Sequence, residues 1–166
     1  MRLRQIQIVC AALAMGMLAA AAVCGGLAYA GVVPANGALT PPLAGFVALS
    51  FPAAVLLGIA VGSSLAQQAR LRWLRAPDPD ESEGVAAFED AFARASLLRV
   101  ATLEGFGLLG AVSALLTGHL LFLIAPAMAV LGIGLVFPTE SKLRAFVDRL
   151  TQPITESEQR LLDATR

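Results

Sequence analysis

Glu104 is the residue of this chain whose type and position most strongly suggest chemistry. It follows Arg99 by five residues and precedes a stretch without charged side chains, 105–137. A carboxylate inside a transmembrane helix is costly, so it usually faces the interior of a helix bundle or a water-filled cavity. Glu104 could therefore handle a proton or another cation. The alternative is a structural hydrogen bond near the membrane interface, where water lowers the cost.

The helical position of Glu104 favours an inward orientation. Small residues, which mark close helix packing, lie within about a quadrant of it at ~100° per residue: Gly107, Ala111, Ala114 and Gly118. Arg99 lies about 140° away around the helix and is not predicted as its partner. The predicted polar neighbours at the same depth come from the two preceding apolar segments: Gln7, Ser63, Ser64 and Gln67.

The residues offer no recognisable catalytic or metal site. There is one His and one Tyr, and no Ser-His-Asp set, P-loop or HExxH motif occurs. Cys10 and Cys24 would be about 21 Å apart on one helix, beyond disulfide reach. We predict no catalytic residue, no metal and no cofactor. A membrane-embedded enzyme would require Glu104 and its four predicted polar neighbours to converge at one depth.

The composition predicts an integral membrane protein. Of the 166 residues, 57% are apolar and 14% charged, and the mean hydropathy is +0.74. Soluble domains are less apolar and about 25% charged. Twelve basic and twelve acidic residues cancel, so there is no overall basic surface for nucleic acid.

Four apolar segments predict an all-α bundle of four transmembrane helices, at 6–30, 43–65, 97–117 and 120–137. The first is too long for the apolar core of a signal peptide and is predicted to be a retained helix. The third must begin before Gly105, because the uncharged stretch is too short for two crossings. A polar cytoplasmic loop is expected at 67–94, with helix from Val85 leading into the third segment. The transmembrane domain then covers 1–138, and 139–166 forms a separate tail.

The positions of the basic residues predict the orientation. Eleven of the twelve Lys and Arg residues lie before the first segment, between the second and third, or after the fourth, and Arg99 lies at the start of the third. The positive-inside rule places these regions in the cytoplasm. We therefore expect a multi-pass protein of a bacterial inner membrane, with both termini cytoplasmic.

A short amphipathic helix is predicted after Pro138. Thr139 is a suitable N-cap, and apolar residues follow at i, i+3, i+4 and i+7: Leu143, Phe146, Val147 and Leu150. Charged residues lie between them. Such a helix lies on the inner leaflet or docks on a partner.

Small residues recur on the first two segments. Gly58 and Gly62 form a GxxxG pair, and Ala12, Gly16 and Ala20 are spaced by four. Both patterns permit close helix contact, with packing inside the chain as the default and an oligomeric seam as the alternative.

Two functions are compatible with this sequence. The leading hypothesis is a non-enzymatic accessory or structural membrane subunit, whose partners are the lipid bilayer and either further copies or a larger membrane complex. The alternative is an oligomeric transporter or channel component that uses Glu104.

The last two segments resemble a loose group of uncharacterised small bacterial four-helix membrane proteins. The matching residues are Ala101, Glu104 and Gly105, in an Ala-x-x-Glu-Gly stretch opening the third helix, and Phe137, Pro138 and Thr139 closing the fourth. The resemblance implies a recurring pattern around Glu104 and the Pro-Thr end, and it implies no activity.

Overall fold

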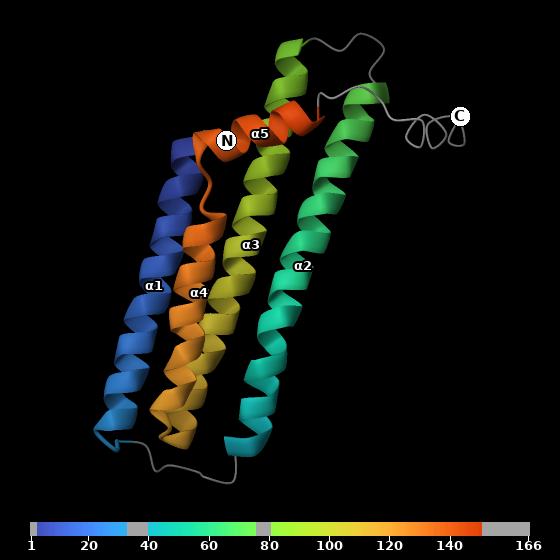
Figure 1. Ribbon diagram of the computed structural model, residues 1–166. Helices are drawn as coiled ribbons and strands as arrows, with labels where there is room; N and C mark the ends of the chain where they lie inside the picture. The colour runs from blue at the N-terminus through green and yellow to red at the C-terminus, as the bar shows by residue number, and fades with distance from the viewer. Residues whose placement is uncertain (1–2, 33–39, 76–80, 151–166) are drawn as a thin grey trace.

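The chain is all-helical throughout the residues that the structure, a computed structural model, describes: 3–32, 40–75 and 81–150. The helices are α1 (Leu3–Tyr29), α2 (Thr40–Arg75), α3 (Glu81–Thr117), the 3₁₀ turn η2 (Leu120–Leu123), α4 (Ile124–Val136) and α5 (Glu140–Leu150). Figure 1 shows α1, α4, α3 and α2 side by side, with α5 lying across one end.

α3 is the central helix of the fold. It packs against α1, α2, α4 and α5, whereas α1 and α2 lie on opposite sides of it (Figure 1). Half of its most apolar stretch is buried (50%), against 11% for α1 and for α2. The surfaces of α1 and α2 that face away from α3 are therefore the apolar exterior of the protein.

Small residues allow the close approach of helices to α3. A Cβ atom at Gly107 would lie 3.0 Å from Ala129 Cβ of α4 and would overlap the Met17 side chain of α1. Ala114 on α3 and Ala129 on α4 are both fully buried. The small residues predicted to line the face of Glu104 thus lie in the helix packing, as expected.

Much of the predicted polar loop at 67–94 is helical. α2 continues to Arg75 and α3 begins at Glu81, so two helices extend beyond the apolar bundle. The helix predicted from Val85 into the third segment is confirmed and begins four residues earlier, whereas the continuation of α2 to Arg75 was not predicted. The cause is tertiary packing: Phe88 and Ala91 of α3 are buried in one cluster with Ala69 of α2, which stabilises both extensions.

The fourth apolar segment is interrupted. The predicted break between the third and fourth segments is confirmed, and Gly118 there adopts a positive φ of 71° that favours glycine. The chain then forms η2 before α4, where one continuous helix over 120–137 was predicted. Pro126 lies in the first turn of α4, where a missing backbone N–H is tolerated.

α5 has the predicted start and the predicted amphipathic pattern. Thr139 Oγ1 accepts a hydrogen bond from the Lys142 backbone N–H at 3.4 Å, in the N-cap geometry. The apolar face packs on the α2 and α3 extensions, where the Phe146 and Phe92 ring centroids lie 5.5 Å apart. This face is therefore occupied by the chain's own helices. The tail beyond Leu150 lies outside the described residues.

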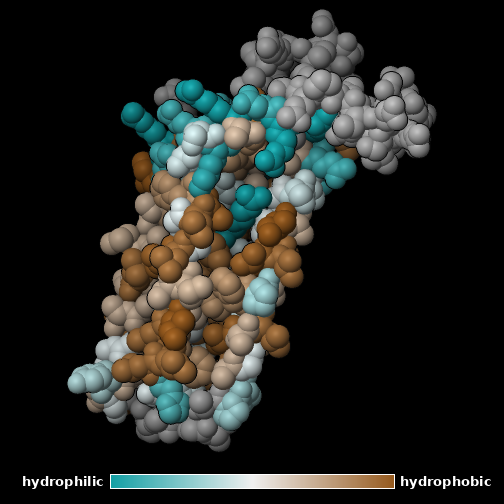
Figure 2. Space-filling model, viewed as in Figure 1, coloured by the Kyte–Doolittle hydropathy of each residue, from teal (hydrophilic) through white to brown (hydrophobic). Residues whose placement is uncertain are grey.

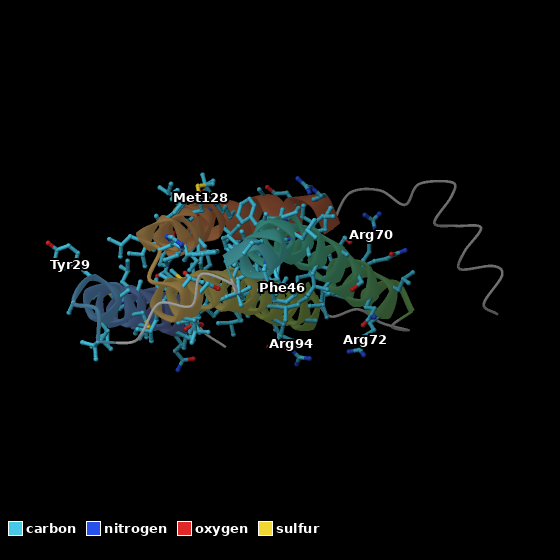
Figure 3. The ribbon with its side chains drawn as sticks, turned by 90° about the horizontal axis from the view of Figure 1, so that it is seen from below. Tyr29, Phe46, Arg70, Arg72, Arg94 and Met128 are labelled. Atoms are coloured by element: carbon cyan, nitrogen blue, oxygen red, sulfur yellow. The ribbon has the colours of Figure 1, made fainter. Side chains whose placement is uncertain are left out.

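The surface matches a protein embedded in a membrane. Among the described residues, three helices are long and apolar enough to cross a membrane, and the bent pair of 120–136 and 140–149, with an angle of 62°, is a candidate for a fourth crossing. Figure 2 shows a broad hydrophobic surface over the bundle and a hydrophilic cap at the α5 end. Arg70, Arg72 and Arg94 lie toward that end, away from Tyr29 (Figure 3).

Candidate functional site

Glu104 lies on α3 as a half-buried side chain. Its neighbours along the same helical face, Val100 and Ala111, are buried, which agrees with the predicted inward-facing position. Within the part of the chain that the structure describes, no side chain or backbone N–H forms a hydrogen bond or ion pair with its carboxylate.

The predicted polar neighbours do not assemble around Glu104. Gln7 Nε2 donates to the Pro138 carbonyl oxygen at 2.9 Å and joins α1 to the end of α4. Ser63 and Ser64 each donate to a carbonyl one turn back in α2, and Gln67 is exposed. The helix that carries Gln7, α1, and the helix that carries the other three residues, α2, lie on opposite sides of α3 (Figure 1).

Arg99, which was predicted only as a remote neighbour, contacts the glycine pair of α2. Its Nε donates to the Gly58 carbonyl oxygen at 3.1 Å. A Cβ atom at Gly58 would lie 3.2 Å from Arg99 Cγ, and one at Gly62 would lie 3.0 Å from Cζ. The GxxxG pair therefore accommodates an arginine side chain, so its predicted intramolecular packing is confirmed.

The Arg99 side chain points along α2 toward the charged end of the molecule. Its Cγ lies beside Gly58 and its guanidinium beside Gly62, one turn nearer to Arg70. This is the direction expected of an arginine that extends its charge out of an apolar layer. Among the described residues, no carboxylate forms an ion pair with Arg99, and Gly58 accepts its one hydrogen bond.

Arg99 lies between two cavities on the α2–α4 side of α3. One, of about 280 Å³, extends toward the middle of the bundle and is lined by Ala54, Gly58, Thr102, Leu103 and Val136, among others. The second, of about 490 Å³, opens toward α5 and also contains Ser63, Ser96, Lys142 and Arg149. Neither lining contains an acidic residue.

Lys142 connects α5 to the end of α4. Its Nζ donates to the carbonyl oxygens of Leu135 and Phe137, at 2.6 and 3.0 Å. These carbonyls lack partners within the helix, and a cation is favoured at a helix C-terminus. The contact holds the Lys142 ammonium group in place beside the 490 Å³ cavity.

A third cavity, of about 630 Å³, lies between the N-terminal half of α2 and the start of α4. Its lining is almost entirely apolar, with Val47, Phe51, Phe106, Phe122 and Met128 among the residues. The Phe51 and Phe106 rings, with centroids 5.0 Å apart, join α2 to α3 at its floor.

No protein-family model, no curated protein and no solved structure matches the chain. In the described residues, no group of three or more His, Cys, Asp or Glu side chains could hold a metal ion.

Sequence analysis did not identify the pairing of Arg99 with Gly58 and Gly62. Both features were visible, the arginine at the start of a span and the GxxxG pair on the preceding one. Their pairing depends on the antiparallel register of α2 and α3, which neither segment encodes alone.

Proposed function

We propose that this chain is a non-enzymatic accessory or structural subunit of a bacterial inner membrane. In this proposal, α1, α2, α3 and η2–α4 each cross the bilayer, both termini are cytoplasmic, and α5 lies at the inner interface. The clustering of basic residues at the α5 end supports this orientation through the positive-inside rule. The resemblance to small four-helix membrane proteins is part of the same proposal.

The observation that carries the proposal is the exposed small-residue face of α1. Ala12, Gly16 and Gly26 are exposed, and Ala20 is half-buried. A Cβ atom at Gly16 or Gly26 would meet no other atom within 4 Å. The default of intramolecular packing is therefore wrong for Gly16, since α1 turns this surface away from α3.

An exposed face of this kind suits a second membrane helix. Without a hydrophobic driving force in lipid, helices associate through close van der Waals packing, which glycine and alanine permit. We propose that α1 binds a transmembrane helix of a further copy or of a larger complex. In that role the chain works by association, and it requires no catalytic group.

Gly16→Leu is expected to abolish this association. The leucine side chain has open space in the isolated chain, so the fold is retained, but it separates the two helix backbones. The measurement is native mass spectrometry of the tagged protein after gentle extraction, in which wild type carries its partner and the variant does not.

Gly134→Leu is the matched control. Gly134 is an exposed helical glycine of α4, also with nothing within 4 Å of a Cβ atom, and its substitution should leave the complex intact. Equal retention of the partner by both variants would contradict the proposal, as would a wild-type chain that is always monomeric.

A second candidate function, cation or proton handling in an oligomeric transporter or channel, is favoured by Glu104. Its half-buried carboxylate receives no hydrogen bond or ion pair from any described residue. A carboxylate with this environment inside a span could bind a cation from a water-filled path. The thin supply of other polar groups along the spans makes this the weaker proposal.

Glu104→Gln separates the two functions. If Glu104 handles a cation, the substitution should abolish a pH- or cation-gradient-driven flux in liposomes and leave the melting temperature unchanged. Ser64→Ala is the control, since Ser64 is exposed and bonds to its own helix. A variant that only lowers the melting temperature would assign Glu104 a structural role.

A further inference from the structure

The groove between α2 and α4 combines one charged end with one apolar end. The cavities along it follow α3 from the α5 end to the opposite end, and the two nearer α5 share Arg99, Ile59 and Val136. Figure 2 shows hydrophilic atoms reaching from the polar cap into a hollow flanked by hydrophobic residues.

At the charged end of the groove, Arg99 has hydrogen-bond donors that the described residues do not use. A guanidinium is always protonated and has five N–H donors, of which one is used, by the Gly58 carbonyl oxygen. An arginine inside a transmembrane bundle normally pairs with an anion or with backbone carbonyls. No described carboxylate pairs with Arg99, so four of its N–H donors remain for an anion from outside the described chain.

Two further cationic side chains make this end of the groove more favourable for an anion. Lys142 and Arg149 line the same cavity as Arg99, and among the described residues no Asp or Glu lines any of the three cavities. Lys142 uses two of its three N–H donors on Leu135 and Phe137. The described side chains that line this cavity therefore carry positive charge only, at the depth where lipid headgroups meet the proposed inner interface.

The apolar end has complementary chemistry. The 630 Å³ cavity is lined by aliphatic and aromatic side chains, with His119 at its outer limit. Phe46 and Leu49 on α2 and Leu121 on η2 are also exposed near it. The 280 Å³ cavity beside Arg99 is also mainly apolar, with Ala54, Val55 and Leu103 in its lining.

We propose that the groove binds one anionic phospholipid of the inner leaflet, with its phosphate on Arg99 and an acyl chain between α2 and α4. Lys142 and Arg149 favour a second negative charge in the headgroup, because basic pockets between helices on the cytoplasmic side select acidic lipids. The glycine pair is essential here, since side chains at Gly58 and Gly62 would displace Arg99. This proposal goes beyond the association through α1, which uses the opposite side of the fold.

The test is lipid binding by the full chain in nanodiscs that contain either phosphatidylglycerol or phosphatidylcholine. Native mass spectrometry of wild type should show one phosphatidylglycerol retained at a collision energy that strips phosphatidylcholine. Arg99→Gln should weaken phosphatidylglycerol binding about ten-fold or more, because a charge-assisted contact is lost. Arg99→Lys should retain the preference, since it keeps the charge.

Arg94→Gln is the matched control. Arg94 has the same charge on the same helix, but it is exposed and pairs with Asp90 at 2.5 Å, outside the groove. Ala48→Phe, at an exposed position lining the apolar cavity, should reduce binding by filling the acyl site and leave Arg99 unchanged. Gly16→Leu should have no effect on the lipid, so the failure of the α1 proposal and the failure of this one are distinguishable.

Three results would overturn the proposal. Equal phosphatidylglycerol retention by Arg99→Gln and Arg94→Gln would show that the charge of Arg99 is irrelevant. Equal retention of both lipids by wild type would show a non-selective lipid surface. An acidic protein helix in the groove, recovered cross-linked to Arg99→Cys in place of lipid, would assign the site to a protein partner.

Discussion

Gly110→Leu is expected to prevent formation of the folded bundle. Gly110 faces the start of α4, where a Cβ atom would lie 2.8 Å from the Phe122 carbonyl oxygen and 3.1 Å from Pro126 Cδ, and would overlap Ala125 Cβ. These are backbone atoms, a proline ring and a methyl group, so none can rotate away. Already the alanine substitution should cost about 1–3 kcal/mol by overpacking, and leucine adds three carbon atoms to the same contact.

The measurement is the melting temperature in detergent, followed by size-exclusion chromatography after heating. Gly105→Leu is the control on the same helix, since Gly105 is exposed and has nothing within 4 Å of a Cβ atom. Both substitutions gain the same helix propensity, so the difference between them reports the packing against α4. Equal melting temperatures would show that α4 does not pack on α3 through Gly110.

Labelling of four single cysteine substitutions should separate them into an outer pair and a cytoplasmic pair. Under the proposed four-span topology, Ala30→Cys and His119→Cys react with a membrane-impermeant maleimide on cells whose outer membrane has been removed and whose inner membrane is intact. Ala86→Cys and Ser141→Cys react only after the membrane is disrupted. All four positions are exposed in the structure. The physical reason is the concentration of Lys and Arg at the α5 end, which the positive-inside rule retains in the cytoplasm.

The protein without a substitution is the negative control for this labelling, because its own cysteines are buried (Cys10) or half-buried (Cys24) within α1. Ser141→Cys tests whether η2 and α4 together cross the membrane. If η2 and α4 failed to cross, α5 would follow α3 to the outer side, and Ser141→Cys would react on intact cells. That result would reduce the number of crossings to three and contradict the proposed location of the C-terminus.

Patterns within single segments predicted the elements of this protein well. Apolar length identified α1, α2 and the membrane part of α3, and the i, i+3, i+4, i+7 pattern after Pro138 identified α5 with Thr139 as its cap. Gly118 identified the turn between α3 and η2. Each of these signals is local, because helix periodicity, capping and positive φ depend on residues a few positions apart.

The extensions of α2 and α3 show where local signals are insufficient. Residues 67–94 are polar enough to be expected as a loop, but their few apolar residues, Ala69, Phe88 and Phe92 among them, are buried against one another and against α5. Tertiary contacts supply most of the stability of such helices. Polarity therefore predicted a segment outside the membrane, and it did not predict that α2 would continue to Arg75.

The candidate sites divide in the same way. The sequence by itself determined that Glu104 and Arg99 lie near the start of an apolar helix, and that Gly16, Gly58 and Gly62 permit close approach. Only the tertiary structure decided that Arg99 lies across Gly58 and Gly62, that Gln7 binds the end of α4, and that Gly16 faces outward. The reason is physical: a residue's type sets which contacts it can make, whereas the register and rotation of each helix against α3 set which contacts it does make.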